Sequence, residues 1–328
     1  MMGFKDIIGQ DSAVELLVEQ LKNRRVSHAF LFTGKDGVGK KRLALEFARA
    51  LFCPEKEADA CGICLSCKKV SHQNHPDIRL VEIDEGDNIK IEQIRELQQE
   101  IAYKPYESDR KVFIIDQADQ MTVQAANSLL KTLEEPPSYA LIILLAEETD
   151  SLLPTVISRC QKIQLNKLPR EEIEKKLKSE GVAPDKAEVI AGLADGSLGR
   201  ALALLGDEEF LNNRQEVYSI LYNLDKMDTV DLFKQADKLT TYLNNGLPLF
   251  ELILSLFRDI ILYKQGNNNR IVNFDFIDDI KVMGKKYKIE ELIGIVNLTN
   301  TISGYIRANV KKDLALQNLL LKIRAKRV

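Results

Sequence analysis

A glycine-rich turn between an apolar segment and a helix-like run constrains this chain more than any other feature. Residues 28–32 read His-Ala-Phe-Leu-Phe, residues 33–41 read Thr-Gly-Lys-Asp-Gly-Val-Gly-Lys-Lys, and a helix-like run follows at 42–52. A strand, a turn ending in Gly-Lys and a helix are together typical of a P-loop. Its backbone N–H groups turn inward around phosphate groups, along a path that a Cβ would obstruct. The residues assigned to this phosphate cradle are Gly34, Gly37, Gly39, Lys40 and Lys41.

Lys41 breaks the P-loop pattern at the position where a metal ligand is expected. Ser or Thr normally follows the loop lysine, and its hydroxyl ligates Mg²⁺. Lys41 brings an ammonium instead, which has no lone pair to give to a metal. The sequence therefore predicts a loop that keeps the cradle, with Lys40 as a point charge for the β- and γ-phosphates, but lacks the metal ligand.

The composition is that of an ordinary globular protein. With 328 residues, of which 45% are hydrophobic and 29% charged, the chain is long enough for two or three domains. It has no apolar leader and no run of about 18 uncharged apolar residues, so we expect neither secretion nor a membrane span, and a cytoplasmic protein. A net charge of −3 excludes nucleic-acid binding through overall basicity. Contact with DNA must then be local or shared with partners, and Arg95 is a candidate.

Four cysteines in a short polar segment predict a metal site. They follow the spacing C-x7-C-x2-C-x2-C, which brings four thiolates together as tetrahedral Zn²⁺ requires. Since four thiolates complete the shell, we interpret the zinc as structural, with no need of His72 or His75 as ligands. Two disulfides or four free thiols are the alternatives, and a reducing cytosol disfavours disulfides. Cys160, far off in sequence, is interpreted as a buried thiol. The predicted ligands are Cys53, Cys61, Cys64 and Cys67.

A second apolar segment ends in a carboxylate. Residues 111–116 read Lys-Val-Phe-Ile-Ile-Asp, which is hydrophobic on both faces, as a central parallel strand should be. Asp116 then occupies the Walker B position, where a carboxylate holds Mg²⁺ through water opposite the P-loop. Working ring-forming ATPases usually place Glu next, to polarise the attacking water, but Gln117 is a neutral amide that does not accept the proton. The alternative for Asp116 is a strand-end carboxylate that caps a helix.

Two longer segments carry a family resemblance. Residues 121–137 read Met-Thr-Val-Gln-Ala-Ala-Asn-Ser-Leu-Leu-Lys-Thr-Leu-Glu-Glu-Pro-Pro, and residues 152–160 read Leu-Leu-Pro-Thr-Val-Ile-Ser-Arg-Cys. Together with the P-loop, the four cysteines and the Asp116 strand end, they resemble the bacterial DNA polymerase III clamp-loader AAA+ family over about residues 9–200. Within that family, the tau/gamma subunit hydrolyses ATP and the delta prime subunit is a stator, so the resemblance leaves a choice between the two.

The resemblance also implies a domain organisation. It gives an α/β P-loop AAA+ domain at residues 1–166, with a parallel sheet flanked by helices and a zinc-binding insertion at 53–67. A small three-helix lid is expected at 167–206. The apolar residues beyond it follow helical spacing, and the resemblance implies an all-α collar domain at 207–328 through which five subunits oligomerise.

Departures from the family pattern favour the delta prime type. Lys41 replaces the metal-ligating hydroxyl, Gln117 replaces the catalytic carboxylate, and Glu147-Glu148 stand where the family's sensor residue reads the γ-phosphate. Together these changes remove metal, base and sensor, so we expect no intrinsic ATPase activity. Lys40 and the glycines still leave two alternatives, ATP or ADP bound without turnover and no nucleotide at all. Arg200 lies at the lid's sensor-2 position, where it either binds phosphate or is a helix-surface charge.

The arginine of the family's Ser-Arg-Cys motif is present in this chain as Arg159. In the family this arginine reaches across a subunit boundary to a neighbour's ATP, where its guanidinium stabilises charge that develops on the γ-phosphate. The resemblance therefore implies that Arg159 is catalytic in trans, as an arginine finger. The alternative is a surface arginine that pairs locally with an acidic residue.

The resemblance implies a role in DNA replication within the DNA polymerase III holoenzyme. The chain would be a stator-like subunit that helps to load the sliding clamp onto primed DNA. Its expected partners are tau/gamma ATPase subunits and the delta subunit in a hetero-pentamer, with the clamp and primer–template DNA contacted through the complex and no membrane partner. The alternative function is a catalytically active, tau/gamma-like ATPase.

Overall fold

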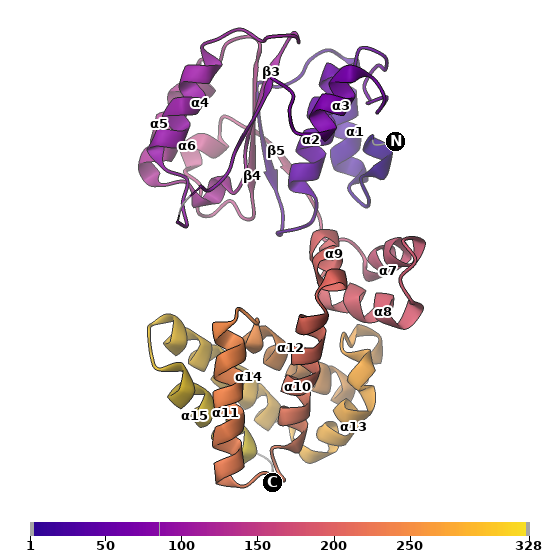
Figure 1. The fold of residues 1–328 in the computed structure, drawn as a ribbon, viewed down its shortest axis with the longest axis vertical. Coiled ribbons are helices and arrows are strands. Elements are labelled where there is room, and N and C mark those ends of the chain that lie inside the picture. The colour runs from indigo at the N-terminus through magenta and orange to yellow at the C-terminus, as the bar shows by residue number, and fades with distance from the viewer. Residues whose placement is uncertain (1–2, 85, 326–328) are drawn as a thin grey trace. The chain divides into compact units, whose positions relative to one another are not determined.

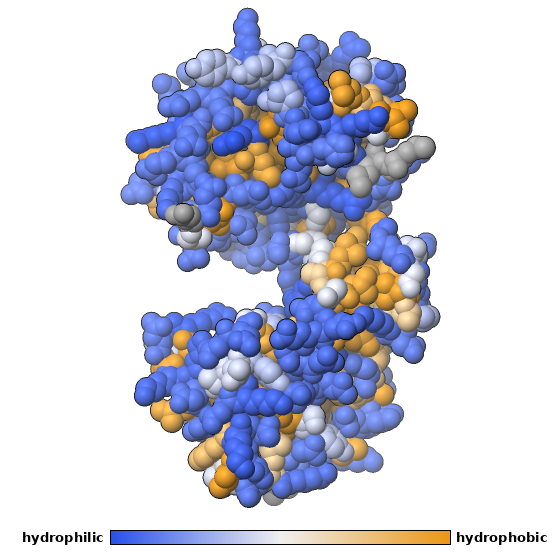
Figure 2. Space-filling model, viewed as in Figure 1, coloured by the Kyte–Doolittle hydropathy of each residue, from blue (hydrophilic) through white to orange (hydrophobic). Residues whose placement is uncertain are grey.

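The computed structural model describes residues 3–84 and 86–325. The chain divides into two compact units. Unit 1 contains Met1–Ile173 and Gly196–Arg200, and unit 2 contains Glu174–Asp195 and Ala201–Val328. None of the helices in the described ranges is long and apolar enough to cross a membrane. The face drawn in Figure 2 is mostly hydrophilic.

Unit 1 is built on a five-stranded parallel sheet with the strand order β2-β3-β4-β1-β5. Three of the strands, β1, β3 and β4, are buried along their whole length. Parallel sheets that are covered on both faces have such unbroken apolar strands, and the Asp116 strand was predicted on this basis, whereas the P-loop strand was predicted from its place before the glycine-rich turn. The strands are β1 Ala29–Thr33, β2 Ile78–Val81, β3 Lys111–Ile115, β4 Ala140–Ala146 and β5 Gln161–Gln164.

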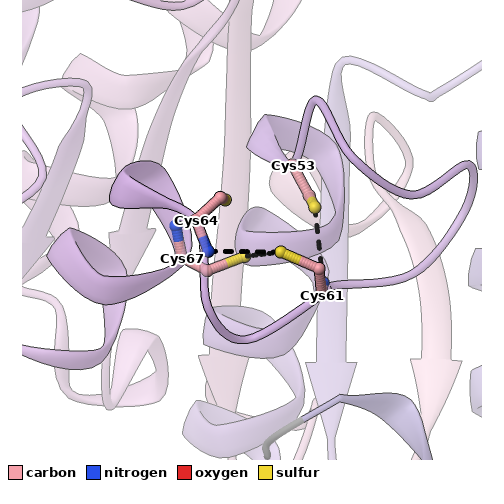
Figure 3. A group of neighbouring side chains, drawn as sticks. All are labelled: Cys53, Cys61, Cys64 and Cys67. Atoms are coloured by element: carbon pink, nitrogen blue, oxygen red, sulfur yellow. Dashed lines mark hydrogen bonds between the residues drawn. The ribbon is translucent and has the colours of Figure 1, made fainter.

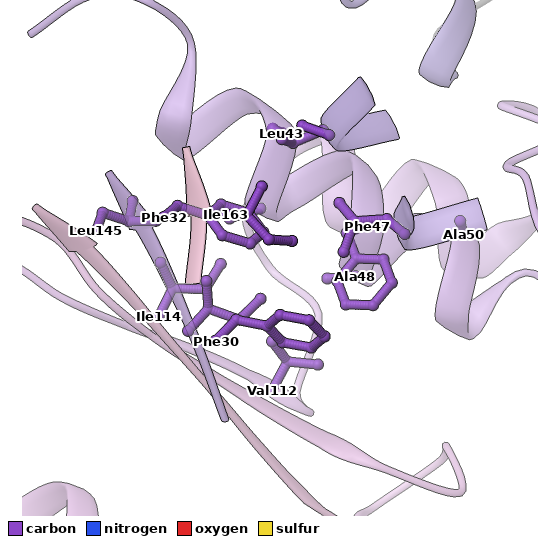
Figure 4. Close-up of a cluster of buried hydrophobic side chains, with 14 of the residues drawn as sticks. Phe30, Phe32, Leu43, Phe47, Ala48, Ala50, Val112, Ile114, Leu145 and Ile163 are labelled. Atoms are coloured by element: carbon purple, nitrogen blue, oxygen red, sulfur yellow. The ribbon is translucent and has the colours of Figure 1, made fainter. Parts of the chain in front are cut away.

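Helices cover both faces of this sheet (Figure 1). On one face, Phe30 and Phe32 pack with Phe47 of α2 (Figure 4), and the rings of Phe30 and Phe47 meet edge to face with centroids 5.5 Å apart. On the other face, Leu31 belongs to a buried cluster that also contains residues of α4, α5 and α6. The alternation follows from the strand period of two. The helices are α1 Asp11–Lys22, α2 Lys40–Phe52, α3 Leu65–Ser71, α4 Ile91–Ile101, α5 Val123–Glu134 and α6 Pro154–Ile157, with the short 3-10 helices η1 Phe4–Asp6 and η2 Ala118–Gln120.

The register of the strands brings their carboxyl ends to one edge of the sheet. Thr33, the last residue of β1, is paired with Ala146 at the end of β4, and Ile115 at the end of β3 is paired with Leu144. The P-loop follows β1, Asp116 follows β3 and Glu147 follows β4. In a parallel sheet the segments beyond these ends are the usual place for a ligand.

The described part of unit 2 is all helical. A buried polar cluster fixes one of its turns, because Arg214 donates to Asn273 Oδ1 at 2.8 Å and Asp259 accepts the N–H groups of Val272 and Asn273 at 2.9 and 2.8 Å. The helices are α8 Pro184–Leu193, α10 Glu208–Asn223, α11 Thr229–Asn244, α12 Leu249–Lys264, α13 Ile277–Lys286, α14 Ile289–Arg307 and α15 Lys312–Ala325, with η3 Asn268–Arg270 and η4 Phe274–Phe276.

The predicted fold class is confirmed, with a parallel sheet flanked by helices and an all-helical C-terminal region. Two further helices, α7 Arg170–Ser179 and α9 Leu198–Gly206, each contain a boundary between the two units. The division into an AAA+ domain, a lid and a collar at 1–166, 167–206 and 207–328 stays a prediction.

Candidate functional site

The P-loop has the backbone path that its glycines predict. Gly34, Gly37 and Gly39 have φ angles of 151°, 71° and 106°. Glycine adopts these positive angles without steric cost. Gly39 is the N-cap of α2, which begins at Lys40. The loop therefore delivers Lys40 to the carboxyl edge of the sheet at a helix N-terminus, a position that favours anions.

Carboxylates of the chain itself face this loop. The N–H of Gly37 donates to Asp36 Oδ1 at 2.8 Å, and the N–H of Asp36 donates to Glu147 Oε1 at 3.4 Å. The ammonium of Lys40 turns back to the loop, where it donates to the carbonyl oxygens of Gly34 and Lys35 at 2.6 and 3.1 Å. Burial lowers the pKa of Lys40, and the charges of Asp36 and Glu147 oppose that shift. Two loop donors thus have anionic partners without any phosphate.

Lys41 pairs with two carboxylates at the neighbouring strand ends. Its Nζ lies 2.5 Å from Glu82 Oε1 and 3.7 Å from Asp116 Oδ2. An ammonium therefore stands beside the carboxylate that would hold Mg²⁺ in a working ATPase. Asp116 also accepts the N–H of Gln117 at 3.0 Å, just before η2. The N-cap residue of η2 is Gln117 and the helix has no side-chain cap, so this contact does not make Asp116 a helix cap. The metal-carboxylate interpretation of Asp116 stays a prediction.

The segment Gly196–Arg200 packs directly on the P-loop. The N–H of Gly199 donates to the carbonyl oxygen of Gly37 at 2.9 Å. Ser197 is fully buried, and its Oγ accepts the N–H of Arg200 at 3.1 Å. The backbone of Arg200 is thus next to the loop. A role for its guanidinium in phosphate binding stays a prediction.

Replacing Gly37 with Ala is expected to destabilise this junction. A Cβ at residue 37 would lie 2.2 Å from Ser197 Oγ and 3.1 Å from the backbone N of Arg200, whereas a Cβ at Gly39 would meet nothing within 4 Å. Since both positions have positive φ, Gly39→Ala measures the backbone strain alone. We expect Gly37→Ala to lower the free energy of unfolding by about 3 kcal/mol and Gly39→Ala by about 1 kcal/mol. Urea unfolding of both variants tests this, and equal losses would contradict the packing argument.

Arg159 lies at the opposite edge of the sheet from the P-loop. It follows α6 and comes two residues before Gln161, the first residue of β5, which runs parallel to β1. The five-residue strand β1 separates the two edges by about 16 Å. Arg159 therefore does not serve the cradle of its own chain.

Local contacts hold the Arg159 guanidinium in place. Its Nη1 donates to the carbonyl oxygen of Thr155 at 2.8 Å and to Ser158 Oγ at 3.3 Å, and its Nη2 donates to Glu134 Oε1. The side chain is 33% exposed. The local pairing with an acidic residue, which was the alternative to a finger, is thus present, and it leaves the side chain accessible.

The four predicted zinc ligands come together (Figure 3). Their Sγ atoms all lie within 4.8 Å of one another, and the edges of a tetrahedral zinc–thiolate site are about 3.8 Å long, since each Zn–S bond is about 2.3 Å. Cys53 follows the last residue of α2, Cys64 caps α3 and Cys67 lies within it, so a metal would join the two helices. All four are free thiols. The arrangement can hold a metal ion.

Backbone N–H groups already point at the sulfur atoms. Cys64 N–H donates to Cys61 Sγ at 3.3 Å, and Cys61 N–H donates to Cys53 Sγ at 3.3 Å. The N–H donors of Ile63 and Cys64 lower the pKa of the Cys61 thiol to about 6. Burial has the opposite effect at Cys67 and raises its pKa. Donors to sulfur favour the thiolate, which is the form that binds metals.

The other candidates lie outside the cysteine cluster. His75 Nδ1 accepts the N–H of Asp77 at 3.2 Å, and its ring stacks on Phe52 with centroids 4.6 Å apart, so it has a structural role. Cys160 is only partly buried, although burial does raise its pKa to about 12. Arg95 is exposed on α4, and a contact with DNA stays a prediction.

Sequence reasoning missed three carboxylates at these sites, Asp36, Glu82 and Glu134. Glu82 carried one usable signal, because it directly follows β2, which is the neighbour of the Asp116 strand. The pairing of Glu134 with Arg159 joins residues 25 positions apart. Nothing in the sequence alone specified that contact.

Two family descriptions match the chain. DNA polymerase III, delta subunit, matches residues 9–169, and DNA polymerase III, delta subunit, C terminal, matches residues 208–325. The chain is 36% identical over 278 residues to DNA polymerase III subunit delta' of Bacillus subtilis, and the match covers 83% of each chain. It is 30% identical over 284 residues to the tau subunit of the same organism, but that match covers 80% of this chain and only 50% of tau.

A solved structure adds a weaker likeness. A DNA polymerase III gamma subunit-related protein of Thermotoga maritima has a TM-score of 0.47 and 22% identity, with 97% of this chain and 100% of that chain covered. The family assignment does not depend on it. The two family matches and the delta' relative together span most of the sequence, with higher identity and fuller coverage than the tau relative. The chain therefore belongs to the delta prime family of bacterial DNA polymerase III clamp-loader subunits.

Proposed function

We propose that this chain is a stator-like clamp-loader subunit that does not hydrolyse ATP and that supplies Arg159 in trans to a neighbouring ATPase subunit. Its partners are tau/gamma subunits and the delta subunit in a hetero-pentamer that loads the sliding clamp onto primed DNA. The observation that carries the proposal is the position of Arg159, at the sheet edge opposite the chain's own P-loop. From that edge, the partly exposed guanidinium does not reach the chain's own cradle and is accessible to a site on a neighbouring subunit.

The contacts of Lys41 support the absence of hydrolysis. Its ammonium pairs with Glu82 and Asp116 where a hydrolysing enzyme needs a divalent cation. Gln117 provides no base for the attacking water. The carboxylates of Asp36 and Glu147 occupy two N–H donors of the cradle and would repel a polyphosphate.

We also propose that the four cysteines bind one structural Zn²⁺. Their spacing, their mutual distances and the N–H groups that point at sulfur all suit a closed tetrahedral thiolate site. The metal would attach the 53–67 loop and α3 to the end of α2. No substrate needs to reach a closed site of this kind, so its contribution is to stability.

ATP turnover by the purified chain alone tests the stator assignment. We expect a rate indistinguishable from that of buffer with Mg-ATP, because metal ligand and base are both missing. The matched positive control is a tau/gamma subunit of the same organism, assayed under the same conditions. Magnesium-dependent turnover by this chain at a comparable rate would show a tau/gamma-like motor instead.

A further inference from the structure

The C-terminus of α5 and the segment after α6 enclose one guanidinium. Glu134 is the last residue of α5, and Arg159 comes two residues after the end of α6. The two helices pack against each other. Three acceptors surround the Arg159 side chain, the Thr155 carbonyl oxygen, Ser158 Oγ and Glu134 Oε1. The first two bind Nη1 from its own segment, and Glu134 alone binds Nη2 from another element.

We propose that Glu134 is a positioning residue for Arg159, which sets the orientation of its guanidinium before a neighbouring subunit arrives. This inference rests on the proposed function, in which Arg159 acts on a neighbour's ATP. Glu134 itself contacts no reacting atom in this account. It acts only through the arginine.

The donor geometry supports positioning rather than blocking. A guanidinium has five N–H donors in a rigid plane. Within the part of the chain that the structure describes, the three hydrogen bonds of Arg159 involve Nη1 and Nη2, so they leave Nε–H and at least one further N–H without a hydrogen-bond partner. Such N–H groups donate to the oxygens of a phosphate or carboxylate. The held guanidinium therefore keeps donors for an anion of a neighbouring subunit.

The ion pair of Arg159 and Glu134 is accessible to solvent, so the guanidinium can still change its orientation. The side chains of Arg159 and Glu134 are 33% and 49% exposed, and ion pairs in such a setting contribute little to stability. Losing Glu134 should therefore leave the fold intact. It should free the guanidinium to sample other rotamers. A catalytic group that is loosely held lowers the rate of the reaction, because misplacement by about 1 Å can cost up to about a hundredfold in rate.

The matched control is the next residue along the chain. Glu135 is exposed and follows α5 directly. Its backbone N–H donates to the Lys131 carbonyl oxygen, but its side chain makes no hydrogen bond or ion pair with any described residue. Glu135→Ala changes the net charge by the same amount as Glu134→Ala at almost the same place. Glu134→Gln is the conservative variant, because its amide oxygen still accepts the Nη2 hydrogen bond.

The test uses the clamp loader reconstituted from the full chain with its tau/gamma and delta partners, and it measures single-turnover hydrolysis of Mg-ATP. At the site that this chain faces, we expect Glu134→Ala to slow hydrolysis about tenfold while the amount of bound ATP stays unchanged. Glu135→Ala should match wild type, and Glu134→Gln should recover most of the rate. In an Arg159→Ala background, Glu134→Ala should have no further effect, because a residue that acts through Arg159 has nothing left to position.

Two results would overturn this inference and leave the proposed function standing. One is a slow Arg159→Ala assembly in which Glu134→Ala hydrolyses ATP as fast as Glu135→Ala. The other is a loss from Glu134→Ala that is equally large with and without Arg159. An undiminished rate for Arg159→Ala alone would overturn the proposed function, and this inference with it.

Discussion

A clamp loader rebuilt with Arg159→Ala is expected to hydrolyse ATP about a thousandfold more slowly at the one site that this chain faces. A guanidinium placed at the γ-phosphate stabilises charge that develops only in the transition state, so its loss lowers the rate of the chemical step. Binding of ATP by the neighbour should change little. Single-turnover hydrolysis with Mg-ATP separates the two effects, since it follows bound nucleotide and chemistry individually.

Arg79→Ala is the matched control for this change. Arg79 lies on β2, is 46% exposed and pairs with Glu100 at 3.6 Å, so it is likewise an accessible arginine with one carboxylate partner. The isolated Arg159→Ala chain should unfold at the same temperature as wild type, because the pair that it loses is exposed. A full hydrolysis rate in an assembly that contains Arg159→Ala would rule out the role in trans.

Local sequence patterns predicted the parts of this site that are close together in the chain. The P-loop glycines lie within a stretch of six residues and the zinc ligands within a stretch of fifteen residues. The sequence spacing alone was therefore enough to predict that each set comes together. Asp116 was identified because an apolar strand ends in it, and strand ends of a parallel sheet meet at one edge. These inferences needed only the strand and helix periods and the chemistry of the side chains.

The contacts that decide the chemistry join distant segments, and the sequence did not specify them. Lys41 and Glu82 are 41 residues apart, and their contact depends on β2 lying beside β3. The absence of a hydroxyl at residue 41 was visible from the sequence as a missing metal ligand. Only the folded structure shows that the ammonium pairs with Glu82 and with Asp116, the carboxylate that would hold the metal.

Removal of zinc is expected to release the 53–67 segment and α3 while the sheet stays folded. Structural zinc sites in small modules contribute about 10 kcal/mol or more of binding free energy, and here the metal would join the end of α2 to α3. The sheet has a core cluster on each face, and neither cluster contains any of the four predicted zinc ligands. After treatment with a strong chelator, we expect amide hydrogen exchange in α3 to quicken about a thousandfold or more, while β1, β3 and β4 keep their protection.

Two serine variants sharpen the zinc experiment. Cys67→Ser removes a fully buried member of the cluster and should reproduce the fast exchange of α3 without any chelator. Cys160→Ser removes the one cysteine outside the cluster and should keep one zinc per chain by metal analysis, with slow exchange in α3. The serine hydroxyl is a poor replacement for a thiolate on Zn²⁺ because the metal favours the softer sulfur ligand. The structural metal site would be refuted if the wild-type chain carried no stoichiometric zinc. It would also be refuted if the chelator left the amide hydrogen exchange rate of α3 unchanged.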